Sequence, residues 1–531
     1  MRSRSTTATA ALVGAAALLL TSCAAPGPSP DAAPGEGTLA DGKTFVSIIA
    51  NDPGTLDPFV TVMSIARTID RFLYSRLIEV QGDGSIVSGL AEEWTADTTT
   101  ATFTLRDGLT CEDGTPLTAT DVAANISYIG DPANASPLVG QQVQAGTTAV
   151  GDDAARTVTV TSGIPDAFLL ENIGSVAIVC ATVLGDPDAL AAGEGATGMF
   201  TMTEIVPNSS YTLTRRPEFS WGPGDWDPEQ PGIPDEAIFR VVPNETTAVN
   251  LLLSGDANAA RVLGPDQQRL EGFFRTDLLA ASGQFIYNQA EGRPTADEAV
   301  RKALTQALDL EQLRQVLTGG EGSVPESLTT ISPNPCRADV VSEFLPAQDT
   351  EAAAAALDDA GWTMGADGVR EKDGTPLALT FIYASAQGDG VTAMAELVQS
   401  TWKELGVDVA LQGVDSPGVS EILFVTGDWD VSAVSITVSL PSMLVPFYSG
   451  PTPPEGTNFA WVDNPDYLAA VTAASGKPGT EGCADWDEAE RALLAATDVV
   501  PFADQPGGSY GQKATFTEFD GIDPASVRMY E

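Results

Sequence analysis

The sequence predicts an α/β fold with two or three domains. Its 531 residues, 43% of them hydrophobic, exceed what one core holds, because single cores stop growing at about 250 to 300 residues. Leu377–Tyr383, Val391–Leu405 and Val407–Leu411 have the patterns of a strand, a helix and a strand, and Gly406 terminates the helix. This crossover predicts a parallel sheet with helices on its faces.

The N-terminal part of the chain also contains expected strands and a helix. Thr44–Ala50 is a short apolar strand, and a Pro- and Gly-containing turn, Asn51–Pro58, follows it. A helix is expected near Ser64–Tyr74. Further on, Arg156–Ser162 alternates as a strand, and Gln284–Asn288 is another strand.

The stretch from residue 73 to residue 128 is a different kind of element. Short apolar runs alternate there with Asp-Gly turn signals, which predicts a meander of short strands. A helix ends the stretch, with Thr118 or Thr120 as its cap after the turn at Pro116. Its apolar face consists of Val122, Ile126 and Ile129.

Two amphipathic helices follow the strand near residue 285. Thr295 and Glu298 have the spacing of a capping box, and Asp309, with Gln312 three residues later, caps the next helix. The apolar stripes are Val300, Ala303, Leu304, Ala307 and Leu308, then Leu310, Leu313, Val316 and Leu317.

The first 22 residues have the pattern of an export signal. Arg2 and Arg4 precede an apolar run, Ala10–Leu20, that is too short for a permanent membrane span. Leu20-Thr21-Ser22-Cys23 matches the bacterial lipobox, in which Cys23 becomes the lipid-modified first residue; the alternative is an ordinary signal peptide with a chance cysteine. Residues 23–42 are rich in Ala, Pro and Gly and are expected to be a flexible tether on the outer face of the membrane.

Charge and composition exclude several functions. The formal net charge is −47, and it becomes −49 once Arg2 and Arg4 are removed, which disfavours nucleic-acid binding and electrostatic membrane docking. The chain contains no histidine, which removes Ser-His-Asp triads and ordinary zinc enzymes. The composition does not exclude catalysis by carboxylates alone, such as the pair of acids in a glycosidase.

Several phrases resemble a known family. LYSRL, GSIVSGLAEEW, TFTLRDG and DGTPLTATDV, within residues 73–122, come in the order found in the family 5 extracellular solute-binding proteins of ABC importers, the dipeptide, oligopeptide and nickel-binding group. The resemblance extends from Phe45 to about Lys513. It implies a periplasmic-binding-protein type II fold, with two α/β lobes joined by a hinge and an extra β-rich subdomain in the first lobe.

The resemblance also implies an organisation and a function. Residues 1–22 are expected to be the signal peptide and residues 23–42 the lipidated tether. Lobe I is expected to contain residues 43–72, 197–285 and 498–531, the subdomain residues 73–196, and lobe II residues 286–497. A monomer would capture a peptide or peptide-like solute between the lobes and deliver it to a membrane permease powered by a cytoplasmic ATPase. No metal, cofactor or nucleic acid is expected.

The expected ligand contacts come from both lobes. In the family, residues after the opening turn approach the ligand, and peptide binders carry an acid in the segment equivalent to Val431–Gly450 that pairs with the peptide's amino terminus. This segment contains no acid here, so we expect an uncharged or amine-blocked solute. The candidate residues are Thr61, Val62 and Met63, the hydroxyls of Thr437, Ser439 and Ser442, and the apolar walls Met63, Trp221 and Phe447.

Two other classes remain open. A secreted hydrolase could use Asp485-Trp486-Asp487 or Asp428-Trp429-Asp430 as paired carboxylates, although the first group leads into an apolar-periodic helix and its acids are better explained as caps. A binding or sensing lipoprotein without transport would share the fold.

Four cysteines remain beyond Cys23. An even number in an exported chain favours disulfides, and four cysteines allow three connectivities. Their wide separation argues against a metal cluster. We expect Cys111 to pair with Cys180 and Cys336 with Cys483, because each pair then lies inside one expected domain.

Overall fold

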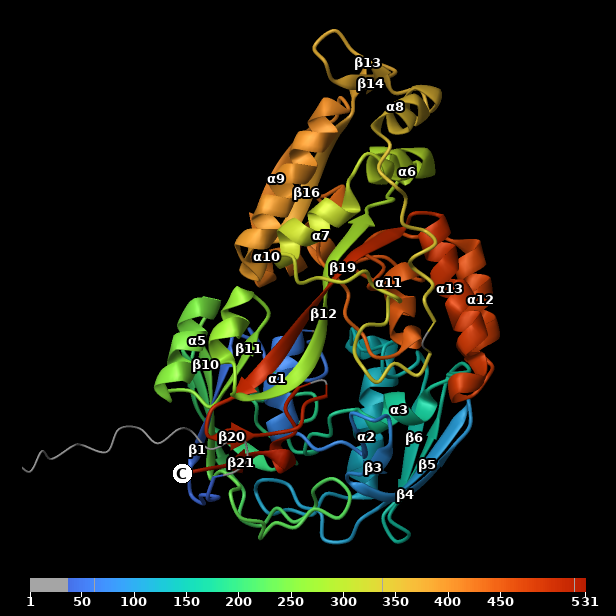
Figure 1. Cartoon of the computed structure of the whole chain (residues 1–531). Helices are drawn as coiled ribbons and strands as arrows, with labels where there is room; N and C mark the ends of the chain where they lie inside the picture. Colours follow the sequence, from blue (N-terminus) through green and yellow to red (C-terminus); the bar gives the residue numbers. More distant parts are fainter. Residues whose placement is uncertain (1–36, 62, 337, 520) are drawn as a thin grey trace, which may run out of the picture.

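A ten-stranded mixed sheet runs through both halves of the molecule (Figure 1). The computed structural model describes residues 37–61, 63–336, 338–519 and 521–531. In spatial order the strands are β17 (Asp408–Val414), β16 (Ala378–Ala384), β18 (Val431–Ser432), β12 (Phe274–Tyr287), β19 (Val499–Gly511), β11 (Ala259–Val262), β1 (Thr44–Ile49), β10 (Glu236–Val241), β9 (Ser210–Arg215) and β8 (Phe200–Val206).

Two long neighbouring strands connect the halves. β12 and β19 pair antiparallel from Phe274 opposite Gly511 to Ile286 opposite Val499. The pairing is irregular between Ala281 and Gln284, which is a β-bulge that bends the ladder locally. In Figure 1 the two strands lead from the half with β1 and β10 to the half with β16 and α9 (Asp389–Glu404).

The predicted strand–helix–strand crossover is confirmed. β16 and β17 are parallel, and α9 connects them. Gly406 has a φ of 89°, the left-handed conformation that glycine adopts easily just after a helix end. β18 lies between β16 and β12, so this crossover is joined directly to one of the connecting strands.

The predicted meander and its helix are also confirmed. A separate four-stranded antiparallel sheet contains β4 (Ala91–Ala96), β5 (Thr100–Leu105), β7 (Thr157–Thr161) and β6 (Thr148–Asp152). α2 (Ala119–Gly130) packs against it, and its cap is Thr118 rather than Thr120: the Thr118 hydroxyl accepts from Asp121 N while the Asp121 carboxylate accepts from Thr118 N.

α1 (Ser64–Leu73) forms where a helix was expected, and α3 (Leu169–Gly174) and α5 (Glu245–Ser254) belong to the same half.

Helices cover both faces of the sheet in the other half. Neighbouring residues of β12 point to opposite sides: Phe285 and Tyr287 join one hydrophobic core, and Ile286 joins another. The first core contains α6 (Glu298–Gln306), α7 (Leu310–Thr318), α8 (Thr350–Asp359) and α9, and the second contains α11 (Val445–Tyr448), α12 (Pro465–Ser475) and α13 (Cys483–Ala495). α10 (Ser416–Glu421) and a π-helical turn, Ile422–Thr426, precede β18.

One predicted cap is wrong and its neighbour is right. Thr295 does not cap α6, because the chain forms a 3₁₀ turn over Pro294–Ala296 and the Thr295 hydroxyl donates to Asn288 O at 2.6 Å. Asp297 caps α6 instead, by accepting from Ala299 N. Asp309 caps α7 as predicted, by accepting from Gln312 N.

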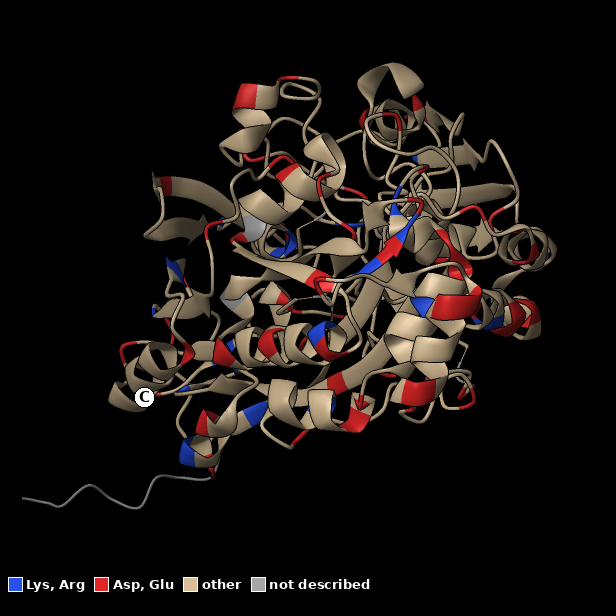
Figure 2. Cartoon of the chain, turned by 90° about the horizontal axis from the view of Figure 1, so that it is seen from above, with Lys and Arg blue, Asp and Glu red and all other residues tan. Residues whose placement is uncertain are grey.

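Acidic side chains are spread over the surface. Figure 2 shows Asp and Glu on many helices and loops of one face, with fewer Lys and Arg. Of the helices that the structure describes, none has the length and hydropathy needed to cross a membrane.

Candidate functional site

The segment after β18 forms a wall beside a connecting strand. Ile436 N donates to the Oε1 of Gln284, a buried residue of β12, at 3.0 Å. Ile436, Val438 and Leu440 point into the lobe II core, whereas Thr437 is exposed and Ser439 half-buried. We call residues 434–442 the wall.

Neutral hydroxyls without protein partners collect at this wall. A neighbouring stretch of chain is held against it, because Thr330 N and Ile331 N both donate to Val438 O, at 3.2 and 3.0 Å. The hydroxyl oxygens of Thr330, Ser435 and Ser442 are buried and have no hydrogen-bond partner in the described part of the chain. A buried hydroxyl needs a partner, so these three groups are suited to a polar ligand.

The other residues predicted on lobe II lie nearby. The Ser439 hydroxyl contacts the Met443 sulfur at 3.6 Å. Phe447 belongs to α11 and packs edge-on against Phe459, with 6.3 Å between ring centroids. Thr437, Ser439 and Ser442 thus lie in the wall itself and Phe447 follows it in α11, and the buried hydroxyls of Thr330 and Ser435 are further candidates that the sequence did not indicate.

The residues predicted on lobe I precede α1. Thr61 is buried, and its hydroxyl accepts from Met63 N at 3.2 Å. The turn before them is fixed to the subdomain, because the Ser136 hydroxyl donates to Phe59 O at 2.6 Å. Val62 lies outside the described residues.

Trp221 occupies a different place. It is buried in lobe I, where its Nε1 donates to the Ser75 hydroxyl at 3.3 Å and the Arg216 guanidinium lies over its ring at 5.5 Å. Its ring also packs on Phe219, with 4.7 Å between centroids. Among the described residues it makes no hydrogen bond or ring contact with lobe II, so the structure does not bring Trp221 together with the wall.

Lobe II also touches the subdomain. Gly479 N donates to Ala167 O at 2.7 Å, and the rings of Phe168 and Trp486 lie 6.2 Å apart. Pro446, in α11 directly after the wall, approaches Gly140, where an added β-carbon would lie 3.4 Å from the proline Cβ. The wall thus lies close to where lobe II meets the other half of the molecule.

One carboxyl group lies on the connecting strands. Asp504 of β19 is 4% exposed, and its Oδ1 has no hydrogen-bond partner among the described residues. Burial and, to a smaller extent, the nearby charge of Glu326 together raise the pKa of Asp504 to about 7. The sequence carried no signal for this residue, because its burial depends on the β12–β19 pairing.

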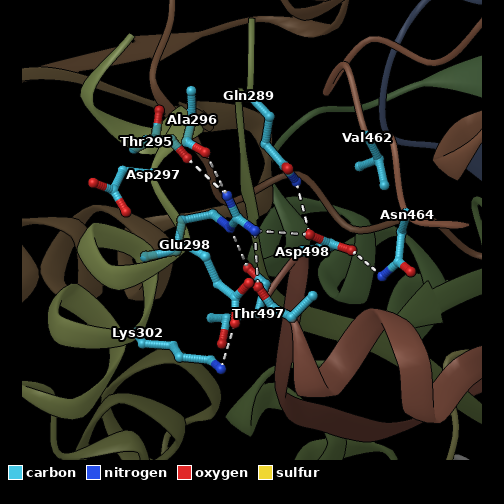
Figure 3. Close-up of polar contacts among 12 residues, drawn as sticks. Gln289, Thr295, Ala296, Asp297, Glu298, Lys302, Val462, Asn464, Thr497 and Asp498 are labelled. Atoms are coloured by element: carbon cyan, nitrogen blue, oxygen red, sulfur yellow. Dashed lines mark hydrogen bonds and ion pairs between the residues drawn. The ribbon is translucent and has the colours of Figure 1, made fainter. Parts of the chain in front are cut away.

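A buried ion pair anchors the lobe II ends of both connecting strands (Figure 3). Asp498 immediately precedes β19, and its Oδ1 accepts from Arg301 Nη2 and from Gln289 Nε2, both at 3.0 Å. Gln289 lies two residues after the end of β12, and Asn464 Nδ2 donates to the other carboxylate oxygen at 2.9 Å. Burial raises the pKa of Asp498, although Asn464, Arg301 and Gln289 each act to lower it.

One acid of each group proposed for hydrolysis has a structural partner. α13 begins at Cys483, so Asp485 lies in its first turn rather than at its cap, and it pairs with Lys477. Asp430 pairs with Arg293 at 2.9 Å and accepts from Thr380 N at 2.7 Å. In the described chain no group of three His, Cys, Asp or Glu side chains is placed to hold a metal ion.

Two disulfides are present. The bonds join Cys111 to Cys180 and Cys336 to Cys483, the pairing expected from the sequence. The first lies within the subdomain, and the second connects the chain before α8 to the start of α13.

These features define a class of protein: two α/β halves connected by neighbouring strands, with a hydroxyl-bearing wall beside the connection. Residues 85–456 match the bacterial extracellular solute-binding proteins of family 5, and the chain belongs to this family. It is therefore an extracytoplasmic solute-binding protein and not an enzyme, and the family implies an ABC transporter as its partner.

Named relatives agree with this assignment. The chain is 26% identical over 509 residues to the periplasmic murein peptide-binding protein MppA of Escherichia coli, covering 88% of this chain and 89% of the relative. A substrate-binding protein from Microbacterium hydrocarbonoxydans, solved with 4-hydroxybenzoate hydrazide, has a TM-score of 0.77 and 25% identity, over 92% of this chain and all of that one.

The fold class is confirmed by a further structure. The oligopeptide-binding protein AppA of Bacillus subtilis, solved with a nonapeptide, has a TM-score of 0.77 at 18% identity, over 93% of this chain and all of that one.

Proposed function

We propose that this protein captures an uncharged or amine-blocked peptide, or a similar polar compound, between its lobes and delivers it to an ABC permease. The observation that carries the proposal is the wall, which supplies buried hydroxyls without partners and no carboxylate. A buried ammonium group would need an anionic partner, because an unpaired buried charge costs several kcal/mol (about 3 to 5).

The relatives support a peptide or other small polar compound as the solute. One is named for a murein peptide, one was solved with a nonapeptide, and one with 4-hydroxybenzoate hydrazide. Polar compounds rich in amide or hydroxyl groups would satisfy Thr330, Ser435 and Ser442 without needing a counter-ion. Thr61, Met63 and, from the resemblance, Val62 would contact the solute from lobe I, and Thr437, Ser439, Ser442 and Phe447 from lobe II.

Closure would follow from these contacts. A solute that touches both lobes only in the closed form stabilises that form by its differential affinity. The lobe boundaries that we propose, near residues 285 and 498, lie at the lobe II ends of β12 and β19. Cys23 would hold the protein at the membrane by its lipid, with the following residues as the tether; Cys23 and residues 24–36 lie outside the described residues. The predicted tether is too long at its C-terminal end, because residues 37–42 pack on the folded chain, where Ala40 N donates to Met529 O at 2.9 Å.

A thermal-shift screen tests the proposal. The panel contains free dipeptides, the same dipeptides acetylated at their amines, oligopeptides, sugars and siderophore-like compounds. A ligand at 100 times its Kd stabilises by about 2.7 kcal/mol, which corresponds to several degrees in Tm. We expect shifts with the acetylated dipeptides or other uncharged compounds. Micromolar binding of several free dipeptides, lost on acetylation, would contradict the proposed solute class.

A further inference from the structure

A fully buried carboxylate in lobe II holds three consecutive residues of another segment. Glu490 lies on α13 and is 6% exposed. Its carboxylate accepts from Leu328 N at 2.8 Å, from the Ser327 hydroxyl at 3.1 Å and from the Thr329 hydroxyl at 3.3 Å. No ion pair to Glu490 occurs among the described residues, so these hydrogen bonds are what offsets its burial.

The segment that Glu490 holds also touches the wall. We call residues 327–331 the strap. Its first three residues bond to Glu490, and its last two, Thr330 and Ile331, donate to Val438 O in the wall. The strap therefore connects α13 to the wall, and it carries the unpartnered Thr330 hydroxyl.

The strap is attached to α13 at a second point. Asn334 Nδ2 donates to Thr329 O at 3.1 Å, and Asn334 Oδ1 accepts from Cys336 N at 2.9 Å. Cys336 is in turn bonded to Cys483 at the start of α13. The two attachment points on α13 are seven residues apart, about 10 Å along the helix.

The groups packed around Glu490 are acidic or neutral. Asp487 lies one turn earlier on α13, and its charge raises the pKa of Glu490. The hydroxyls of Tyr448 on α11 and Tyr467 on α12 are buried without partners, and the charge of Glu490 contributes to raising the pKa of each. Burial, the largest cause, raises the pKa of Glu490 to about 7.

We propose that Glu490 is a positioning residue: it fixes the strap, and through the strap the wall, and its protonation adjusts how often the strap opens. The proposal rests on the proposed function only in treating the wall as a solute-contacting surface. Opening of the strap exposes Glu490 to water, where its pKa returns toward the ordinary 4.5. The closed form thus binds the proton more tightly, and a rise in pH through the range 4.5 to 7 favours opening.

Hydrogen–deuterium exchange of the full chain tests this without a solute. Rates, corrected for the intrinsic effect of pH, are compared at pH 5 and pH 8 for peptides covering 326–332 and 434–442. In the wild type we expect the strap to exchange at least about tenfold faster at pH 8, a change of about 1.4 kcal/mol in opening free energy. Glu490→Gln should remove this pH dependence, because the amide does not titrate.

Two further variants separate positioning from general stability. Glu490→Ala removes the acceptor and should speed exchange of both segments about tenfold or more, whereas Glu490→Gln, which keeps one acceptor oxygen, should restore much of the protection. Glu488→Ala is the matched control, since Glu488 is exposed on the same helix and only weakly paired with Arg491, at 3.9 Å.

The outcomes are distinct. Faster exchange of the strap and wall in Glu490→Ala, with rescue by Gln and no change in Glu488→Ala, supports the proposal. Uniformly faster exchange across lobe II, or a pH dependence that persists in Glu490→Gln, overturns it. Failure of every compound in the thermal-shift screen would count against the proposed function and leave this exchange result standing.

Discussion

Replacement of Arg301 by Met should destabilise lobe II more than any surface change. The guanidinium donates to Thr497 O and to Ala496 O at 3.1 and 2.9 Å, and to Asp498 Oδ1 at 3.0 Å. It also donates to the carbonyls of Thr295 and Ala296, both at 3.1 Å. The Arg301 and Asp498 side chains are only 4% and 2% exposed, so water cannot replace the lost donor.

The expected magnitude follows from this burial. Removing one partner of a buried ion pair costs about 3 to 5 kcal/mol, because the remaining charge is left uncompensated. Gln289 and Asn464 still donate to Asp498, and its already raised pKa lets it take up a proton, which limits the loss. We therefore expect Arg301→Met to lower the free energy of unfolding by about 4 kcal/mol at pH 7. Asp498→Asn should cost less, about 2 kcal/mol, because the amide keeps an acceptor oxygen.

A double-mutant cycle measures the pair directly. Urea unfolding of the wild type, both single variants and the double variant gives the coupling energy, which should reach about 2 kcal/mol. Lys302→Met is the control, since Lys302 is half exposed and the partner it has among the described residues is the exposed Glu298; its change should stay within about 0.5 kcal/mol. A loss below about 1 kcal/mol in Arg301→Met, or additive single changes, would refute the reasoning.

Three other predictions can be checked separately. Replacing Cys23 by Ser should move the protein from the membrane to the soluble fraction, and unchanged membrane association would rule out the lipid anchor. Non-reducing peptide mapping should recover the Cys111–Cys180 and Cys336–Cys483 bridges, and loss of either should cost about 4 kcal/mol in the chain-entropy model; free thiols or a bridge between lobes would contradict the pairing. Asp504, whose pKa is raised from 3.8 to about 7, binds its proton more tightly in the folded state, so wild-type stability should fall as pH rises from about 4 to 7. Asp504→Asn should therefore be more stable than the wild type at pH 8, by up to about 4 kcal/mol, and equal to it near pH 4; parallel pH profiles of unfolding would disprove this.

Elements governed by neighbouring residues could be predicted from the sequence. The β16–α9–β17 crossover follows from periodicity and from Gly406. Asp309 caps α7 because the acceptor and the free N–H groups are separated by only three residues. The predicted cap at Thr295 is wrong although its spacing fits, because the Thr295 hydroxyl donates to Asn288 O instead of capping the helix.

The candidate site depends on contacts between distant residues, and sequence patterns do not encode these. Glu490 meets Leu328 across 162 positions, and Gln284 meets Ile436 across 152. Trp221 is predicted as an apolar wall of the ligand site, whereas in the structure its ring packs against Phe219 inside lobe I. The hydroxyl of Thr330 could not be recognised, because nothing in its own neighbourhood indicates that it is buried without a partner.

The two connecting strands have a mechanical consequence. β12 and β19 pair with each other through backbone hydrogen bonds, so the halves are joined by one two-stranded ribbon and not by two separate strands. Such a ribbon can bend out of its own plane and keep its inter-strand hydrogen bonds, whereas sliding one strand along the other would break all of these hydrogen bonds. Both disulfides join residues outside these two strands, one within the subdomain and one within lobe II, so neither bond links the two halves covalently.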